Sequence, residues 1–145
     1  MSISAGAWRL PGWRGQVQVL DVDECVHLLT AHHVGRIAYC TESGPRVVPM
    51  NYALAGNTLI FRTGHDTEAA RYLPGAPVAF EVDDIDEFLQ AAWSVVVQAH
   101  AEIVPAETLR LMDRPQFPQP WAPGNRSMVL QLSLDSVSGR RIHPS

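Results

Sequence analysis

The residues best suited to binding chemistry are two arginines and two threonines that the predicted strand order brings together. Arg46 begins one predicted strand, Arg62 and Thr63 end the next, and Thr67 starts the short helix that follows. If these strands pair as hairpins, the side chains converge on one rim of the sheet. Guanidinium groups, hydroxyls and the N–H groups at a helix start are donors that suit a phosphate. The pattern therefore indicates an anion site, against the simpler interpretation of surface arginines and β-forming threonines.

Two other groups of polar residues have simpler interpretations. His65 and Glu68 are three positions apart at the same helix start and could face one metal ion, but a first-turn acid also stabilises a helix by itself. Residues 81–87 include five carboxylates, which could bind calcium or act as catalytic acids. Because no glycine-rich ligand loop accompanies them, a solvated strand end is favoured. We therefore predict no catalytic side chain and no metal site.

The basic residues exclude several functions. Lys and Arg together number eleven, and all of them are Arg, which removes lysine Schiff bases, a lysine general base and a Walker-type phosphate loop. The formal net charge is −4 and there is no basic block, so nucleic-acid binding is not expected. No signal peptide or membrane-spanning stretch is recognisable. These features predict a cytoplasmic protein without membrane association, with Cys25 and Cys40 as reduced thiols.

The elements that must position these residues are mostly strands. A chain of 145 residues is one domain by length; residues 1–16 are expected to form an arm and residues 17–145 the folded domain. A helix should start after Asp21 or Asp23 and stop at Gly35. Pro49 marks its strand as an edge, a bulge or a bend. Strands are predicted at 36–41, 46–54, 58–63, 78–84, 92–104, 129–134 and 137–142, and further helices at 67–73 and 105–113.

This order of elements predicts a mainly β (α+β) fold. Six or seven largely antiparallel strands with three short helices are typical of a small closed or nearly closed β-barrel that carries helices at its rim.

The order of several short segments also carries a resemblance to a known family. They are Gly35-Arg-Ile-Ala38, Arg46-Val-Val-Pro-Met-Asn-Tyr52, Leu59-Ile-Phe-Arg-Thr63, Val78-Ala-Phe-Glu-Val-Asp83, Trp93-Ser-Val-Val-Val97, Pro120-Trp-Ala-Pro-Gly124 and Ser138-Gly-Arg-Arg-Ile142. Over roughly residues 20–142 the chain resembles the pyridoxamine 5′-phosphate oxidase-like family of flavin-binding split barrels, especially its short bacterial members.

The resemblance implies a six- to seven-stranded antiparallel split β-barrel with short flanking helices, and a homodimer that holds two FMN molecules at its interface. The residues implied along the flavin ring are Val48, Pro49, Met50 and Asn51. Those implied at the ribityl and phosphate end are Phe61, Arg62, Thr63 and Thr67, with Arg46 as a further phosphate donor. Trp93 and Ser94 reach the site on the long strand, and Trp121 covers the ring from the partner chain.

One position departs from the family pattern. Many relatives have Thr-Lys at the helix start, with the Lys reaching the phosphate, whereas Thr67 is followed here by Glu68. At an effective dielectric of about 20, one charge pair about 4 Å apart is worth on the order of 4 kcal/mol before screening. Either Arg46, Arg62 and helix N–H groups hold the phosphate alone, or FMN affinity is low, or another cofactor is used. Glu68 pointing into solvent is the remaining alternative.

The resulting hypothesis is an FMN-dependent oxidoreductase that passes hydride from a reduced nicotinamide through the flavin to a small organic acceptor, with nitro compounds as candidates by resemblance. Because the cofactor supplies the redox chemistry, few protein acids or bases are required. The alternatives are a deazaflavin-dependent reductase and a non-enzymatic flavin- or haem-binding dimer. Oxidation of pyridoxamine phosphate itself is less expected, since the short chain lacks an obvious second phosphate cage.

Overall fold

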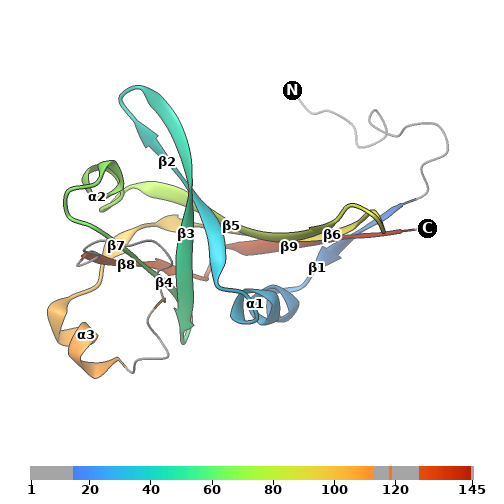
Figure 1. Ribbon diagram of the computed structural model, residues 1–145. Coiled ribbons are helices and arrows are strands. Elements are labelled where there is room, and N and C mark those ends of the chain that lie inside the picture. The colour runs from blue at the N-terminus through green and yellow to red at the C-terminus, as the bar shows by residue number, and fades with distance from the viewer. Residues whose placement is uncertain (1–14, 113–117, 119–127, 145) are drawn as a thin grey trace.

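The computed structural model describes residues 15–112, 118 and 128–144, and they form one curled antiparallel sheet with three short helices (Figure 1). In chain order the elements are β1 (Gln16–Leu20), α1 (Val22–Thr30), β2 (Val34–Thr41), β3 (Gly44–Ala55), β4 (Thr58–Thr63), α2 (Glu68–Tyr72), β5 (Pro77–Asp86), β6 (Ala91–His100), β7 (Glu102–Ile103), α3 (Ala106–Leu111), β8 (Met128–Ser133) and β9 (Val137–His143). The strand order across the sheet is β1-β9-β6-β5-β2-β3-β4-β8-β7.

Strand β3 changes partner along its length, and this change curls the sheet. Its first part, Gly44–Asn51, pairs with β2, whereas Tyr52–Ala55 pairs with β4. In Figure 1 the β2–β3 hairpin rises across a layer formed by β5, β6, β9 and β1. Pro49 lies in the first part, which no described strand pairs with on its β4 side, so of the three alternatives predicted for it (an edge, a bulge or a bend) the structure has the edge.

The two faces of the sheet differ because side chains alternate along each strand. We call the face that carries Ile37, Phe80 and Val95 the inner face; all three side chains are fully buried. Helix α1 packs on this face against β9, β3 and β6 and buries Cys25 and Leu29 completely. The opposite face, which we call the outer face, is largely open over β5, β6, β9 and β1.

Helix α1 begins as the sequence predicts. Asp21 is its N-cap, and the side chain accepts a hydrogen bond of 2.8 Å from the N–H of Glu24. The helix ends at Thr30, and the predicted stop at Gly35 is wrong because Gly35 lies inside β2. A Cβ at Gly35 would collide with the ring of Phe80 and lie 2.7 Å from the carbonyl oxygen of Glu81. Close packing between β2 and β5, not a helix end, explains this glycine.

The strand count exceeds the six or seven predicted, because the described residues form nine strands. Strand β1 was missed although Gln16-Val-Gln-Val-Leu20 alternates polar and apolar residues, because the run is only five residues long, begins at the end of the expected arm and has four exposed residues. Strand β7 was missed because the predicted strand 92–104 is interrupted at Ala101, whose N–H bonds to the carbonyl of Ala76. Strand β1 also begins at Gln16, the last residue of the expected arm; residues 1–14 of that arm lie outside the described part.

The helices are all short. Thr67 caps α2, and Pro105 precedes α3, at the starts predicted for both. The longest of the described helices, α1, has nine residues. No helix in the described residues has the length and apolar character needed to cross a membrane.

Candidate functional site

The candidate site is built where β3 leaves β2 for β4. Gly44–Asn51 pairs with β2, and no other described strand pairs with Gly44–Met50, so the other edge of Gly44–Met50 presents backbone groups without a strand partner. The end of β4 and the start of α2 border this edge, because Glu68 contacts Arg46 on β3 and Thr67 contacts Thr63 on β4. We call this opening the split. Such a backbone edge can form hydrogen bonds with the donors and acceptors of a ligand.

Alternation along β3 and β4 places the predicted binding residues on two faces. Val48 and Met50 are half-buried and pack on the inner core. Phe61 and Thr63 on β4 are buried on the same side. Side chains alternate along a strand, so the outer side of β3 and β4 carries Pro49, Asn51 and Arg62.

The sequence predicts that Arg62 and Thr63 lie on one rim, but the structure places them on opposite sides of β4. Arg62 is directly opposite Val129 in the register of β4 and β8, and Val129 belongs to a second apolar cluster with Ile60 on the outer side. Arg46, Thr63 and Thr67 are the members that the structure brings to one side of the split.

Glu68 turns toward Arg46 and does not point away into solvent. Its Oε1 lies 3.3 Å from Nε of Arg46 and accepts a hydrogen bond of 3.0 Å from the hydroxyl of Tyr39. Tyr39 and Arg46 are direct partners in the register of β2 and β3, which aims both side chains at the first turn of α2. Burial raises the pKa of Tyr39 and the hydrogen bond to Glu68 raises it further, so the phenol keeps its proton and donates.

The two threonine hydroxyls bond to each other. Thr63 Oγ1 and Thr67 Oγ1 are 2.9 Å apart. Thr67 Oγ1 also donates to the carbonyl of Gly64 at 2.9 Å and accepts from the N–H of Ala70 at 3.1 Å. Thr63 is only 2% exposed, so this network lies in the wall of the split and holds α2 against the end of β4.

Trp93 and Ser94 occupy opposite faces of β6. Trp93 is half-buried against the inner core, where its ring meets His32 edge-on with centroids 4.7 Å apart. Ser94 lies on the outer face and pairs in register with Arg140 of β9. Trp121, the predicted cover of the ring, lies outside the described residues.

The outer face holds a groove that the sequence did not reveal. It has a volume of about 490 Å³ and is lined by Val19, Glu81, Asp83, Ile85, Ala92, Trp93, Ser94, Val96, Ser138, Gly139, Arg140 and Ile142. The only early signal was alternation within the acidic run, which sends Glu81, Asp83 and Ile85 to one face.

Arg36 on β2 joins two of those acids at the edge of the groove. Its Nε and Nη2 donate to Oε1 of Glu81 at 2.9 and 2.6 Å, and Nη2 also donates to Oδ2 of Asp83 at 2.8 Å. Burial is the largest influence on Glu81 and raises its pKa, Asp83 adds to the rise, and Arg36 opposes it. The predicted solvated strand end therefore describes Asp84, Asp86 and Glu87, which are exposed, and not the first two acids of the run.

A sheet that opens where one strand changes partner, with a short helix bordering the opening, defines this protein as an antiparallel split β-barrel. The chain belongs to the pyridoxamine 5′-phosphate oxidase family, whose model matches residues 21–141.

Individual relatives agree with this assignment. An uncharacterized protein of Mycobacterium tuberculosis, Rv0080, is 29% identical over 133 residues, which cover 88% of this chain and 86% of that protein. An FAD-binding protein of Mycobacterium smegmatis is 25% identical with a TM-score of 0.66, over 87% of this chain and 98% of that one. An FAD-binding protein of Mesorhizobium loti is 26% identical with a TM-score of 0.67, over 86% and 97%.

The fold extends to more distant sequences. A candidate pyridoxamine 5′-phosphate oxidase from Corynebacterium glutamicum is 23% identical with a TM-score of 0.75, and the match covers 92% of this chain and 98% of that one. At this level of identity the likeness concerns the fold alone.

Proposed function

We propose that this protein binds a flavin in the split along β3 and uses it as the redox cofactor of an oxidoreductase. The observation that carries the proposal is the backbone edge of Gly44–Met50, which no described strand pairs with, beside a half-buried apolar strip. The FAD-binding relatives of M. smegmatis and M. loti, which match most of this chain, support the choice of ligand.

The residues of the split fit the ring end of a flavin. Val48 and Met50 offer apolar contact, and the backbone of β3 around them offers carbonyl groups and, except at Pro49, N–H groups. A bound flavin would supply the electron-transfer chemistry. The role of the chain is to hold the ring, orient one face toward the substrate and exclude water from the other.

The reaction we propose takes its electrons from a reduced nicotinamide and delivers them to a small organic acceptor. Because the flavin supplies the redox chemistry, the reaction requires few acids or bases from the protein.

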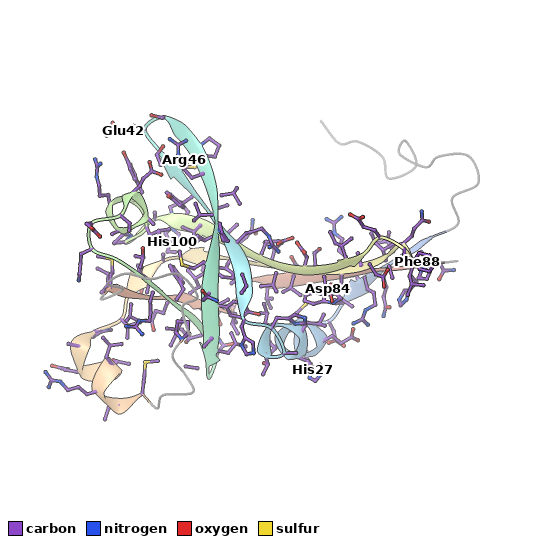
Figure 2. All side chains as sticks on the ribbon, viewed as in Figure 1. His27, Glu42, Arg46, Asp84, Phe88 and His100 are labelled. Carbon is purple, nitrogen blue, oxygen red and sulfur yellow. The ribbon has the colours of Figure 1, made fainter. Side chains whose placement is uncertain are left out.

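We further propose that a second copy of the chain completes the site. The outer face that carries the groove also carries exposed apolar side chains, with Val19 81% and Ile85 63% exposed, and Phe88 at the hairpin tip is 94% exposed (Figure 2). Contiguous exposed apolar residues of this kind are typical of protein interfaces. A homodimer through this face would bury them.

The test of the function is the visible absorption spectrum of the purified protein, with mass identification of any molecule released on denaturation. We expect a flavin, or uptake of added flavin by the colourless protein. A protein that binds no flavin contradicts the proposal, and a released deazaflavin or haem would replace it with the corresponding alternative.

The test of the dimer is light scattering on Val19→Asp and Ile85→Asp, with Leu111→Asp as the matched control. Leu111 is 86% exposed but lies on α3, away from the groove. We expect a dimer for the wild type and for Leu111→Asp and a monomer for the other two variants. If all three variants remain dimeric, this face is excluded as the interface.

A further inference from the structure

The outer face of the sheet carries opposite charges at equal distances from β6. The register places Asp83 of β5 opposite Ser94 of β6, and Ser94 opposite Arg140 of β9, so these three residues form one row across the face. Figure 1 shows the three strands side by side in one layer. Because neighbouring strands are about 4.8 Å apart, Asp83 and Arg140 lie about one strand spacing to either side of β6.

The two ends of this row differ in net charge within the chain. Arg140 is exposed in the wall of the groove, and no hydrogen bond or ion pair joins it to another described residue. Asp83 accepts from Arg36, but Arg36 is shared with Glu81. One guanidinium for two carboxylates leaves an excess negative charge on that side of β6, whereas the side of Arg140 is positive.

The neighbouring row on the same face is apolar. Ile85, Ala92 and Ile142 are aligned in register across β5, β6 and β9, and Ile85 is 63% exposed. The outward side chains of β6 in these two rows, Ala92 and Ser94, are small, so a second sheet can approach closely over this strand. Sheets that pack face to face lie about 10 Å apart, with their strands aligned to within about 30°.

A two-fold axis that runs along β6, parallel to the face, pairs these charges. Rotation about this axis exchanges the two sides of β6, so Asp83 of one chain faces the partner's Arg140, and the same contact occurs twice. An axis across the strands would instead place Asp83 on Asp83 and Arg140 on Arg140. Like charges directly opposed at an interface disfavour that arrangement.

We propose that the outer face recognises a second copy of this chain through two reciprocal pairs of Asp83 and Arg140, with β6 on the two-fold axis. This inference rests on the proposed homodimer, to which it adds the register and the residues that recognise the partner. In the same arrangement Ile85 packs against the partner's Ile142, and the small side chains of β6 meet at the axis.

The first test reverses each charge and measures the dissociation constant of the dimer by sedimentation velocity. Asp83→Arg and Arg140→Asp each replace two attractive contacts by two repulsive ones, so each should raise the dissociation constant at least about a hundredfold. An equimolar mixture of the two variants restores both pairs, and native mass spectrometry should find the mixed dimer by its mass. Arg110→Asp, the same charge change at an exposed position of α3, is the control and should remain dimeric.

A milder set guards against misfolding of Asp83→Arg, which loses the contact with Arg36. The amide oxygen of Asp83→Asn can still accept from Arg36, and Arg140→Gln removes only the charge. Each should weaken the dimer by about tenfold or more, whereas the double variant should lose no more than the weaker of the two single variants. Circular dichroism checks that every variant is folded.

The outcomes separate this inference from the homodimer itself. Folded charge-reversed variants that stay monomeric when mixed overturn the inference, as do losses that simply add in the double variant. An Arg140→Asp variant that dimerises as well as Arg110→Asp also overturns it, while loss of the dimer in Val19→Asp and Ile85→Asp would retain the proposed interface. A monomeric wild type overturns both the proposed homodimer and the inference, and leaves this face to a different occupant.

Discussion

Arg36 and Arg46 lie on the same β2–β3 hairpin and meet carboxylates in different ways. Arg36 holds Glu81 and Asp83 through three hydrogen bonds of 2.6 to 2.9 Å, and all three residues lie on paired strands of one sheet. Arg46 meets Glu68 at 3.3 Å, across the gap between a strand and a short helix. Figure 2 shows Arg46 on the raised part of the hairpin, far from the Phe88 tip of the β5–β6 layer.

The difference follows from how each pair is positioned. Strand register places Glu81 directly opposite Arg36, so no separate element has to be ordered to form the contact. The pair of Arg46 and Glu68 depends on where α2 sits, and both side chains are about two-fifths exposed, at 41% and 45%. Exposed pairs of this kind contribute little to stability. We infer that the Arg36 cluster stabilises the fold, whereas the Arg46 pair contributes little to stability.

The largest expected effect is on stability in Arg36→Ala. Removing the guanidinium leaves Glu81 and Asp83 as two partly buried carboxylates on the same side of β5, with side chains 33% and 26% exposed. Their unpaired charges should lower the free energy of unfolding at neutral pH by about 2 kcal/mol. Urea unfolding measures this loss. Arg110→Ala, at an exposed position on α3, is the control and should change stability by less than about 0.5 kcal/mol.

The second prediction concerns pH and sharpens the first. The folded-state pKa of Glu81 is raised above its ordinary value of 4.5, and it should rise further without Arg36. A carboxyl group with a raised folded pKa contributes stability that is present below the ordinary value and is lost as pH rises through the folded value. The stability deficit of Arg36→Ala should therefore be small near pH 4.5 and full near pH 7.

The test measures the free energy of unfolding across this pH range. It compares the wild type, Arg36→Ala and the double variant Arg36→Ala/Glu81→Gln. The double variant lacks the titrating group, so most of the pH dependence of the deficit should disappear. A deficit of equal size at both ends of the range would show that lost packing, and not charge, is responsible.

The smallest expected effect on stability is that of Arg46→Ala. Because its partner Glu68 is half-exposed and remains hydrated, the loss in the free energy of unfolding should be less than about 1 kcal/mol. The same urea experiment tests this. A loss as large as that of Arg36→Ala would contradict the comparison and would make the Arg46 pair a structural element of the fold.

Local signals in the sequence were enough for much of the fold. Asp21 and Thr67 are side-chain caps whose partners lie three residues away, so helix starts could be predicted from short segments. The meander of β2, β3 and β4 could be predicted from alternation and turns, and Pro49 correctly indicated an edge. Strand β1 was missed although its residues alternate, because the run is short and four of its five residues are exposed, and its pairing with β9 joins distant parts of the chain.

The candidate site was predictable in its residue types and only partly in its geometry. Consecutive residues such as Arg62 and Thr63 read as one motif in the sequence, yet a strand sends them to opposite faces. The groove on the outer face is lined by four strands from distant parts of the chain, so no local sequence pattern predicts it.

By itself, the sequence determined which chemistry the split can use. With no lysine in the chain, any anion held there must be bound by arginine, hydroxyl and backbone groups, and an acid follows Thr67 at the helix start. Composition and the order of adjacent residues determine which donors and charges a segment offers, because these depend on residue type alone.

Only the tertiary structure decided where that acid points. Glu68 reaches Arg46 and Tyr39 because the register of β2 and β3 aligns those two residues and the threonine network holds α2 against β4. These contacts join residues from three separate segments of the chain, and their relative placement is set by packing rather than by the residues adjacent in sequence.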